Sequence, residues 1–364
     1  MNHVMLIGAG GNIGSHLVPL LARIPEIGRL TLIDRDRYEA RNRENQDLPP
    51  GVGAVGRNKA TVQAARARRL NRGLAVQAVA EDVETLPLGR LRCDLILAAL
   101  DSRRARQRVN QAALRLGIPW LDGGVLGAGM LARITRYVPG EDLPCLECRW
   151  DPADYAALEQ SYPCEGAPAP ATTAPAGLGA LTAALLALEC RKLLRGEAGA
   201  LPPGAELVLD AAHHRHYVTG VRRNPACRIG SHAPWPVEPL AVRTDESLGA
   251  ALAALRQRTG ANGDLAVSFD GKLIARRLSC EDCGAVKPIL RLFGSLRPGV
   301  LRCARCGGRA APNGFGLLER LEAASLTRPE GNRSLAALGV RSGEILTCTA
   351  GGRDTHFELR SKAP

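Results

Sequence analysis

Four cysteines in the last third of the chain have the spacing of a metal site. Cys280 and Cys283 form one Cys-x-x-Cys pair, and Cys303 and Cys306 form a second pair after an interval of nineteen residues. Four thiolates complete the tetrahedral coordination of a structural zinc ion and leave no open position for catalysis. The spacing therefore predicts a zinc ribbon in a small domain that presents a surface to a protein partner. Binding of nucleic acid is the alternative use of such a ribbon.

A second set of residues, in the first third of the chain, has the chemistry of a nucleotide site. A glycine-rich turn follows the apolar run 4–7, Asp34 closes the next apolar segment, Lys59 begins a helical pattern, and Asp101 ends a later apolar run. Backbone amides at a helix start bind phosphates, and a carboxylate after the second strand binds ribose hydroxyls. A lysine suits the phosphate charge, and a further carboxylate suits Mg²⁺. These residues predict a site for ATP with Mg²⁺.

The glycine turn by itself is weaker evidence than the full set. Ile13 stands where the strict G-x-G-x-x-G fingerprint of dinucleotide sites requires a third glycine, although Gly14 follows directly. An ordinary tight turn between a strand and a helix is the alternative interpretation. Because Asp34, Lys59 and Asp101 accompany the turn, we favour ATP over a dinucleotide.

The elements that must position these residues alternate along the first half of the chain. Apolar runs predict strands near 3–7, 30–33, 75–79, 94–100 and 119–122, and helical periodicity lies between them near 14–23, 58–71 and 104–116. This order predicts an α/β fold with a Rossmann-like, doubly wound and mostly parallel sheet, whose ligand site lies at the carboxyl ends of the strands. Alternating segments at 130–138, 206–209 and 217–221 are expected to extend the sheet with antiparallel strands.

The second half of the chain is expected to hold a crossover and a separate domain. The Pro-, Ala- and Thr-rich segment 163–175 predicts a mobile crossover loop before a buried helix over 176–194. Prolines near Trp235 mark a boundary between a domain over 1–235 and a smaller α+β domain over 236–364 that contains the ribbon. In the smaller domain we expect a helix near 247–258, a strand pair at 265–269 and 272–278, and a short helix with two strands in the tail 334–359. The stretch 334–346 of this tail resembles part of a ubiquitin-like fold, and a generic small α/β element is the alternative.

Composition narrows the class of protein. The chain has 364 residues, a net charge of +12 and 3% aromatic residues. It begins without a basic and apolar leader and has no apolar stretch of membrane length, so we expect a cytoplasmic protein without a membrane partner. The arginines are scattered along helices and few aromatics are present to stack on bases, so we expect no nucleic-acid partner.

Three segments together resemble the family of ubiquitin-activating enzymes and their bacterial ThiF-type relatives. They are the acidic and Asn-rich stretch 34–46, the segment 55–60 and the triplet 100–102, and the resemblance covers roughly residues 1–235. It implies an adenylyltransferase that uses ATP to activate the C-terminal carboxylate of a ubiquitin-like protein. It also implies the following contacts: Gly8, Gly10 and Gly11 approach the nucleotide, Asp34 holds the ribose, Asn42 and Lys59 contact the phosphates, and Asp101 binds Mg²⁺.

Two features depart from the family pattern. The family's Asn-x-x-Arg-Gln motif reads Asn42-Arg43-Glu44-Asn45-Gln46 here, so the expected arginine is replaced by Asn45. We expect Arg41 or Arg43 to supply the missing charge and Gln46 to remain at the nucleotide. The second departure is that this sequence starts at its first strand, without the helix that donates an arginine across the dimer in many bacterial relatives.

The resemblance also implies a second structural zinc site. Cys145 and Cys148 form a turn pair, and in this family a second pair follows the crossover helix and a strand hairpin. Cys227 and His232 stand at that place here, with the histidine replacing the usual fourth cysteine. Two reduced cysteines without metal are the alternative interpretation.

Cys164 lies at the start of the crossover loop, where the family often places a cysteine that accepts the acyl group as a thioester or carries sulfur. A dispensable cysteine is the alternative. The function expected from these features is adenylation of a ubiquitin-like protein by a homodimer, followed by transfer to a conjugating enzyme or to a sulfur acceptor. Activation of a sulfur-carrier protein or peptide for sulfur transfer or biosynthesis is the alternative. A nicotinamide-dependent reductase and a zinc-ribbon nucleic-acid-binding or regulatory protein are the rival interpretations.

Overall fold

A computed structural model of the chain describes residues 1–49, 53–159, 174–261, 263–312 and 316–359. They form two compact units. The first contains Met1–Leu86 and Arg92–Trp235, and the second contains Pro236–Pro364 together with the short segment Pro87–Leu91. In the described part of the chain, every helix is too short or too polar to span a lipid bilayer.

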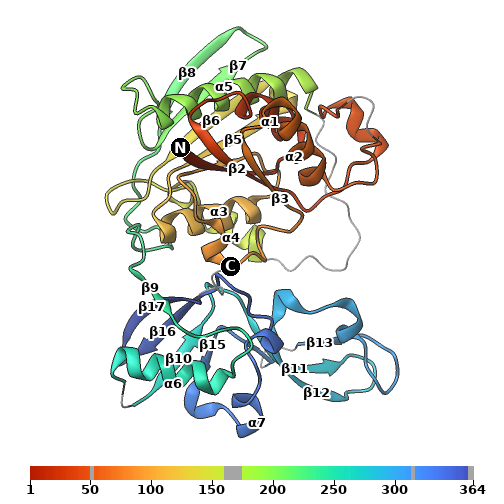
Figure 1. Cartoon of the computed structure of the whole chain (residues 1–364), viewed down its shortest axis with the longest axis vertical. Helices are drawn as coiled ribbons and strands as arrows, with labels where there is room; N and C mark the ends of the chain where they lie inside the picture. Colours follow the sequence, from red (N-terminus) through yellow and green to blue (C-terminus); the bar gives the residue numbers. More distant parts are fainter. Residues whose placement is uncertain (50–52, 160–173, 262, 313–315, 360–364) are drawn as a thin grey trace. The chain divides into compact units, whose positions relative to one another are not determined.

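The first unit is built on an eight-stranded sheet with the strand order β3-β2-β1-β4-β5-β6-β7-β8 (Figure 1). Strands β1 to β5 run parallel, and each later neighbour is antiparallel. The strands are β1 (Asn2–Ile7), β2 (Ile27–Ile33), β3 (Ala75–Val79), β4 (Leu95–Ala98), β5 (Trp120–Leu126), β6 (Leu131–Tyr137), β7 (Ala205–Asp210) and β8 (Arg215–Gly220). The predicted doubly wound sheet with an antiparallel extension is confirmed.

Helices cover both faces of this sheet (Figure 1). On one face lie α1 (Asn12–Leu21), α2 (Lys59–Leu70) and α5 (Ala176–Leu194), and their apolar side chains form one core with alternate residues of the strands. On the other face lies α3 (Arg103–Leu116), with α4 (Pro152–Glu159) beside it. The Ser102 hydroxyl caps α3 by accepting a hydrogen bond from the Ala105 amide, and Gly117 ends it in the left-handed conformation.

The second unit contains a five-stranded sheet, β15-β10-β16-β17-β9, and a smaller sheet, β12-β11-β13, in which β14 also pairs with β11. Helix α6 (Leu248–Thr259) packs on the larger sheet, and α7 (Arg328–Gly331) is one short turn. The strands are β9 (Val237–Leu240), β10 (Leu265–Ser268), β11 (Ile274–Cys280), β12 (Val286–Leu292), β13 (Ala310–Ala311), β14 (Leu317–Leu318), β15 (Arg320–Glu322), β16 (Ile345–Ala350) and β17 (Arg353–Leu359).

The expected pairing of the strands at 265–269 and 272–278 is wrong. Strand β10 pairs with β15 and β16, whereas β11 pairs with β12, β13 and β14, and only an isolated bridge joins Phe269 to Lys272. The physical reason is that β11 contributes to two cores. Ile274 packs in the same cluster as Leu265 and Val267 of β10 and the residues of α6, whereas Ala275 and Leu278 belong to the separate apolar cluster of the small sheet.

Candidate functional site

The glycine turn packs tightly against the end of β4. Gly8 has a φ of +86°, and a Cβ at this position would lie 2.3 Å from the carbonyl oxygen of Ala99. A Cβ on Gly14 would lie 2.0 Å from the Gly8 carbonyl oxygen. Glycine is required at both places because any side chain would displace backbone atoms. The turn then opens α1, whose first turn has backbone amides without acceptors inside the helix and no acidic side chain.

Asp34 joins the end of β2 to this turn. Its two carboxylate oxygens accept hydrogen bonds from the backbone amides of Gly10, at 2.8 Å, and of Asp36, at 3.0 Å. Burial raises the pKa of Asp34, against the lowering effect of these two amides. The carboxyl group is therefore fixed at the carboxyl edge of the sheet, beside the amides that were predicted to approach phosphates.

Lys59 lies against the same turn. A Cβ on Gly10 would lie 2.3 Å from the Lys59 Cβ, so the absence of a side chain at Gly10 admits the lysine. The Lys59 side chain is 9% exposed, and its Nζ lies 3.5 Å from an Asp36 carboxylate oxygen. Asn58 caps α2 by accepting from the Thr61 amide, and its Nδ2 donates to the carbonyl oxygens of Asp34 and Asp36. These bonds hold the start of α2, and with it Lys59, beside Asp34.

The loop after β2 contains the predicted motif Asn42 to Gln46. Residues Ala40–Glu44 form a 3₁₀ helix, η1, in which Asn42 Oδ1 accepts from the Glu39 amide at 2.8 Å. Arg41 is paired with Glu39 at 2.7 Å, whereas Arg43 is exposed and forms no ion pair with any described residue. The buried Gln46 Oε1 has no hydrogen-bond partner in the described part of the chain. Arg43 and Gln46 are therefore available to a ligand.

Asp101 follows β4 and directly precedes Ser102, the residue that caps α3. It is exposed, and its side chain forms no hydrogen bond or ion pair with the residues that the structure describes. Gly10, Asp34 and Lys59 are joined by direct contacts, whereas Asn42 and Asp101 occupy the neighbouring loops at the same edge of the sheet. Cys164, the predicted acyl or sulfur acceptor, lies outside the described residues.

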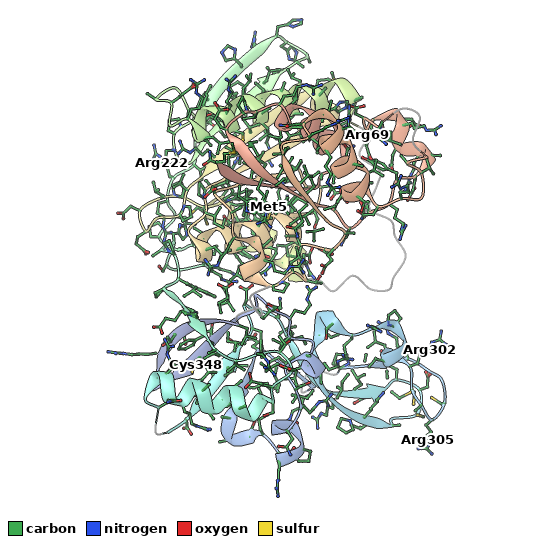
Figure 2. The ribbon with its side chains drawn as sticks, viewed as in Figure 1. Met5, Arg69, Arg222, Arg302, Arg305 and Cys348 are labelled. Carbon is green, nitrogen blue, oxygen red and sulfur yellow. The ribbon has the colours of Figure 1, made fainter. Side chains whose placement is uncertain are left out.

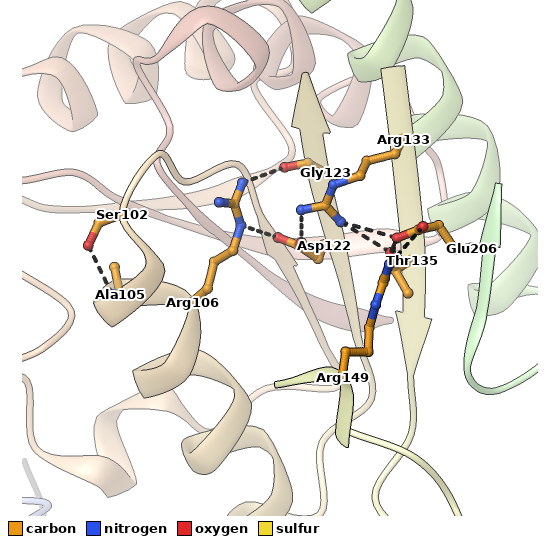
Figure 3. Close-up of polar contacts among 9 residues, drawn as sticks. All are labelled: Ser102, Ala105, Arg106, Asp122, Gly123, Arg133, Thr135, Arg149 and Glu206. Atoms are coloured by element: carbon orange, nitrogen blue, oxygen red, sulfur yellow. Dashed lines mark hydrogen bonds and ion pairs between the residues drawn. The ribbon is translucent and has the colours of Figure 1, made fainter. Parts of the chain in front are cut away.

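A ladder of charged side chains, which the sequence analysis missed, crosses the antiparallel strands (Figure 3). Asp122 is fully buried and accepts from Arg106 Nε and from a terminal nitrogen of Arg133, both at 2.9 Å. Arg133 also approaches Glu206 at 3.4 Å, and Glu206 accepts from Arg149 at 2.6 Å. Burial alone would raise the pKa of Glu206, but hydrogen bonds from Arg149 and Thr135 outweigh it and keep that pKa below its usual value.

The register of the sheet places this charged ladder in line with the nucleotide loops. Ile7 pairs with Ile33 and with Ala98, Ala98 pairs with Asp122, and Asp122 pairs with Thr135, which pairs with Glu206. One row across the sheet thus runs from the residue before Asp34 to Glu206. A polar residue within the apolar strand β5 was the signal available in the sequence.

Three cysteines and a histidine of the first unit converge on one point. The Sγ of Cys145 lies 4.0 Å from that of Cys148 and 3.9 Å from that of Cys227, and Cys148 Sγ lies 4.0 Å from His232 Nε2. Zinc–sulfur bonds of about 2.3 Å in a tetrahedron place sulfur atoms about 3.8 Å apart, so the set fits zinc. His232 Nδ1 donates to the Leu143 carbonyl at 2.7 Å, which directs the Nε2 lone pair into the cluster.

The four cysteines of the predicted ribbon also meet. Cys280 and Cys306 approach to 3.4 Å and Cys283 and Cys303 to 3.7 Å between their Sγ atoms, and all four ligand atoms lie within 4.8 Å of one another. The first cluster is buried, whereas Cys306 of this second cluster is exposed. Both predicted sets are therefore assembled, each with the donor chemistry of a structural zinc site.

The fold and the loops at its strand ends define a Rossmann-like α/β protein of the doubly wound class with an antiparallel extension. The chain belongs to the ThiF family, whose model matches residues 1–228.

The chain is similar to curated relatives in sequence and to a solved structure in fold. The chain is 31% identical over 239 residues to the sulfur carrier protein adenylyltransferase of Thermus thermophilus, and the match covers 64% of this chain and 83% of that protein. It is 29% identical over 160 residues to ubiquitin-like modifier-activating enzyme 5 of Oryza sativa, of which it spans 37% of the length. The crystal structure of Escherichia coli MccB with ATP superimposes with a TM-score of 0.51 at 24% identity, covering 63% of this chain and 66% of that one. This likeness supports the fold.

Proposed function

We propose that this chain uses ATP and Mg²⁺ to adenylate the C-terminal carboxylate of a small ubiquitin-like or sulfur-carrier protein. The contacts that bring Gly10, Asp34 and Lys59 together at the carboxyl edge of the sheet carry the proposal. Membership of the ThiF family and the similarity to a sulfur carrier protein adenylyltransferase support it.

In the proposed reaction, an oxygen of the substrate carboxylate attacks the α-phosphorus of ATP. The bond to the bridging oxygen of the β-phosphate breaks, pyrophosphate leaves with that electron pair, and an acyl adenylate forms. The barrier is lowered by cations placed beside the leaving pyrophosphate, which stabilise its growing negative charge, and by holding the two reactants in line. The buried Lys59 ammonium is suited to this role because it is already desolvated and held beside the helix start that would bind phosphate.

Each remaining residue of the proposed site has a role that its chemistry allows. The carboxylate oxygens of Asp34 each keep a lone pair for a ribose hydroxyl after accepting their backbone hydrogen bonds. Asp101 would ligate Mg²⁺, which suits an exposed carboxylate that has no partner among the described residues. The other residues assigned to the nucleotide are Gly8 and Gly11 for close backbone approach, Asn42 and Gln46 for hydrogen bonds to phosphate, and Arg43 for charge.

Pyrophosphate exchange with purified ubiquitin-like proteins tests the reaction. Radiolabelled pyrophosphate is expected to enter ATP only when a cognate partner is present, and Lys59→Ala or Asp101→Ala is expected to reduce the rate by about 10²-fold or more. Arg69→Ala, an exposed position on the same helix as Lys59, is the matched control and should leave the rate unchanged. Exchange that persists in Asp101→Ala, or that no ubiquitin-like protein supports, would contradict the proposal.

We further propose that Cys164 accepts the activated acyl group as a thioester before transfer to a conjugating enzyme, within a homodimer. In this step the thiolate attacks the adenylate carbonyl and AMP leaves. A covalent enzyme–partner species that is sensitive to thiol reductant and missing in Cys164→Ala supports this step. If the species survives in that variant, or if sulfur transfer alone is detected, the thioester assignment fails while the adenylation proposal stands.

A further inference from the structure

Positive charge in the second unit is concentrated in one segment. Residues 272–309, which contain the ribbon cysteines, include nine basic and two acidic residues, a net charge of +7. The remainder of that unit, residues 87–91, 236–271 and 310–364, includes eleven of each and has no net charge. A zinc ion with four thiolates contributes −2, so the loaded segment still has a net charge of +5.

Five of these cations are exposed and have no acidic partner among the described residues: Arg277, Lys287, Arg297, Arg302 and Arg305. The other four basic residues of the segment are paired with acids or half-buried. Lys272 is paired with Glu344, Arg276 with Glu330 and Arg309 with Glu281, and Arg291 is half-buried. The five exposed side chains, which we call the ribbon cations, are therefore free to bind an external anion.

Two of the ribbon cations lie on the backbone that carries the four-cysteine cluster. Arg302 precedes Cys303, and Arg305 lies between Cys303 and Cys306, with its amide 3.4 Å from the Cys303 Sγ (Figure 2). Arg302 also forms a β-bridge with Arg309. A rigid loop reduces the conformational entropy that is lost when its arginines bind, so these two positions are pre-organised. On the strand pair beside them, Arg277 is in register with Pro288, next to Lys287.

The type of charge favours a nucleic-acid backbone over an acidic protein surface. Four of the five ribbon cations are arginines, whose planar guanidinium binds phosphate oxygens in a bidentate manner. Phe293 is 42% exposed in the same segment and offers a ring to stack on a base. Protein interfaces place most of their charged residues at a solvated rim, where each residue contributes little to the binding free energy. Each contact with a nucleic-acid phosphate, in contrast, increases the affinity because it releases counterions.

We propose that the zinc ribbon of the second unit binds nucleic acid through the phosphate backbone, using the ribbon cations. The expectation from the sequence that the chain has no nucleic-acid partner rested on arginines along the helices of the first unit. The ribbon cations differ from those arginines because they lie in a segment with only two acidic residues. Five phosphate contacts predict that log Kd rises with log salt concentration with a slope of about 3.5 for a single strand and about 4.5 for duplex DNA. Between 50 and 200 mM salt, affinity is then expected to fall by about 10²-fold.

Fluorescence anisotropy with the zinc-loaded full chain tests this proposal. The probes are a labelled 20-nucleotide single-stranded RNA and a DNA duplex of the same sequence, and poly-glutamate of matched charge serves as competitor. The double variant Arg302→Gln, Arg305→Gln is expected to lower the slope by about 1.4 for the single strand and about 1.8 for the duplex, because two phosphate contacts are lost. The matched control, Arg256→Gln with Arg328→Gln, removes the same charge from exposed positions outside the ribbon and should leave the slope unchanged.

Equal slopes for the ribbon variant and the control would overturn the proposal, and so would displacement of the probe by poly-glutamate as effective as by unlabelled RNA. Zinc content and circular dichroism of the variants confirm that the ribbon is intact before binding is compared. Pyrophosphate exchange should be unaffected by the ribbon variant, so failure of this inference and failure of the adenylation proposal give different results.

Discussion

Replacing Asp122 by Asn is expected to destabilise the first unit by about 3 kcal/mol. Asp122 is fully buried and accepts two charged hydrogen bonds of 2.9 Å, from Arg106 and Arg133. Removing one partner of a buried ion pair costs about 3–5 kcal/mol, because the remaining charge stays desolvated without compensation. Arg133 is 32% exposed and stays close to Glu206 after the substitution, so its charge remains partly solvated and partly paired. The expected cost therefore lies at the lower end of the range of about 3–5 kcal/mol.

Urea unfolding monitored by tryptophan fluorescence measures this cost. All three tryptophans, Trp120, Trp150 and Trp235, lie in the first unit, and Trp120 stacks on Tyr137 with ring centroids 4.8 Å apart, two residues from Asp122 along the strand. The midpoint should fall while the dependence of the free energy on urea stays constant. Asp142→Asn, an exposed carboxylate of the same unit, is the control and should change stability by less than about 0.5 kcal/mol.

A double-mutant cycle with Arg133→Gln separates the interaction from the two side chains. If Asp122 and Arg133 interact as the structure indicates, the double variant will cost less than the sum of the single variants, by about 1 kcal/mol or more. Costs that add to within about 0.5 kcal/mol, or an Asp122→Asn variant that loses less than about 1 kcal/mol, would refute the view that the charged ladder stabilises the sheet.

Three further outcomes are expected. Gly10→Ala should weaken ATP binding at least tenfold in calorimetry, because its Cβ would lie 2.3 Å from the Lys59 Cβ, whereas Gly177→Ala, which meets open space, should not; equal affinities would contradict the proposed site. Metal analysis should find two zinc ions per unsubstituted chain and one ion in the Cys306→Ser variant. The control variant Cys348→Ser, whose thiol lies outside both clusters, should keep two ions, and two ions in Cys306→Ser would contradict a zinc site in the ribbon. Hydrogen bonds from Arg276 lower the pKa of Glu330 from 4.5 to about 2. The pair's contribution to stability is thus complete above pH 4.5 and lost as the pH falls toward 2. NMR titration of the carboxyl carbon should give the low pKa, and Arg276→Gln should raise that pKa, because the largest cause of the lowering is removed; an ordinary pKa in the unsubstituted chain would contradict this.

The sequence predicted those parts of the structure that depend on local pattern. Strand β4 and helix α5 were predictable because one is a continuous apolar run and the other an uninterrupted helical pattern of Ala and Leu. The pairs Cys145/Cys148, Cys280/Cys283 and Cys303/Cys306 were predictable because a spacing of three residues lets a tight turn present both thiols to one ion. Cys227 and His232 are five residues apart and were placed by the family resemblance. Asp34 and Asp101 were located because residues at strand ends share an edge whatever the order of the strands.

Features that depend on register between distant strands could not be predicted. The charged ladder joins residues from α3, β5, β6, the 3₁₀ helix Leu146–Arg149, and β7, which no local spacing relates. Arg133 and Thr135 share a face of β6 by alternation, but only the pairing of β6 with β5 and β7 places Asp122 and Glu206 opposite Thr135 and within reach of Arg133. The segment Pro87–Leu91 is a similar case. Its backbone bonds to Gly343 in the second unit, and nothing in its composition distinguishes it from an ordinary loop.

Net charge did not discriminate among partners because it counts two populations of arginine as one. The guanidinium groups of Arg106 and Arg133 are neutralised by buried acids, and a cation that is already paired in the free protein releases no counterions when a ligand binds. Arg302 and Arg305 are exposed and have no acidic partner among the described residues, so binding of a polyanion there gains the full counterion term. The quantity that predicts a polyanion partner is therefore the number of exposed cations without an acidic partner rather than the net charge, and among the described residues of the second unit five of them lie within the segment 272–309.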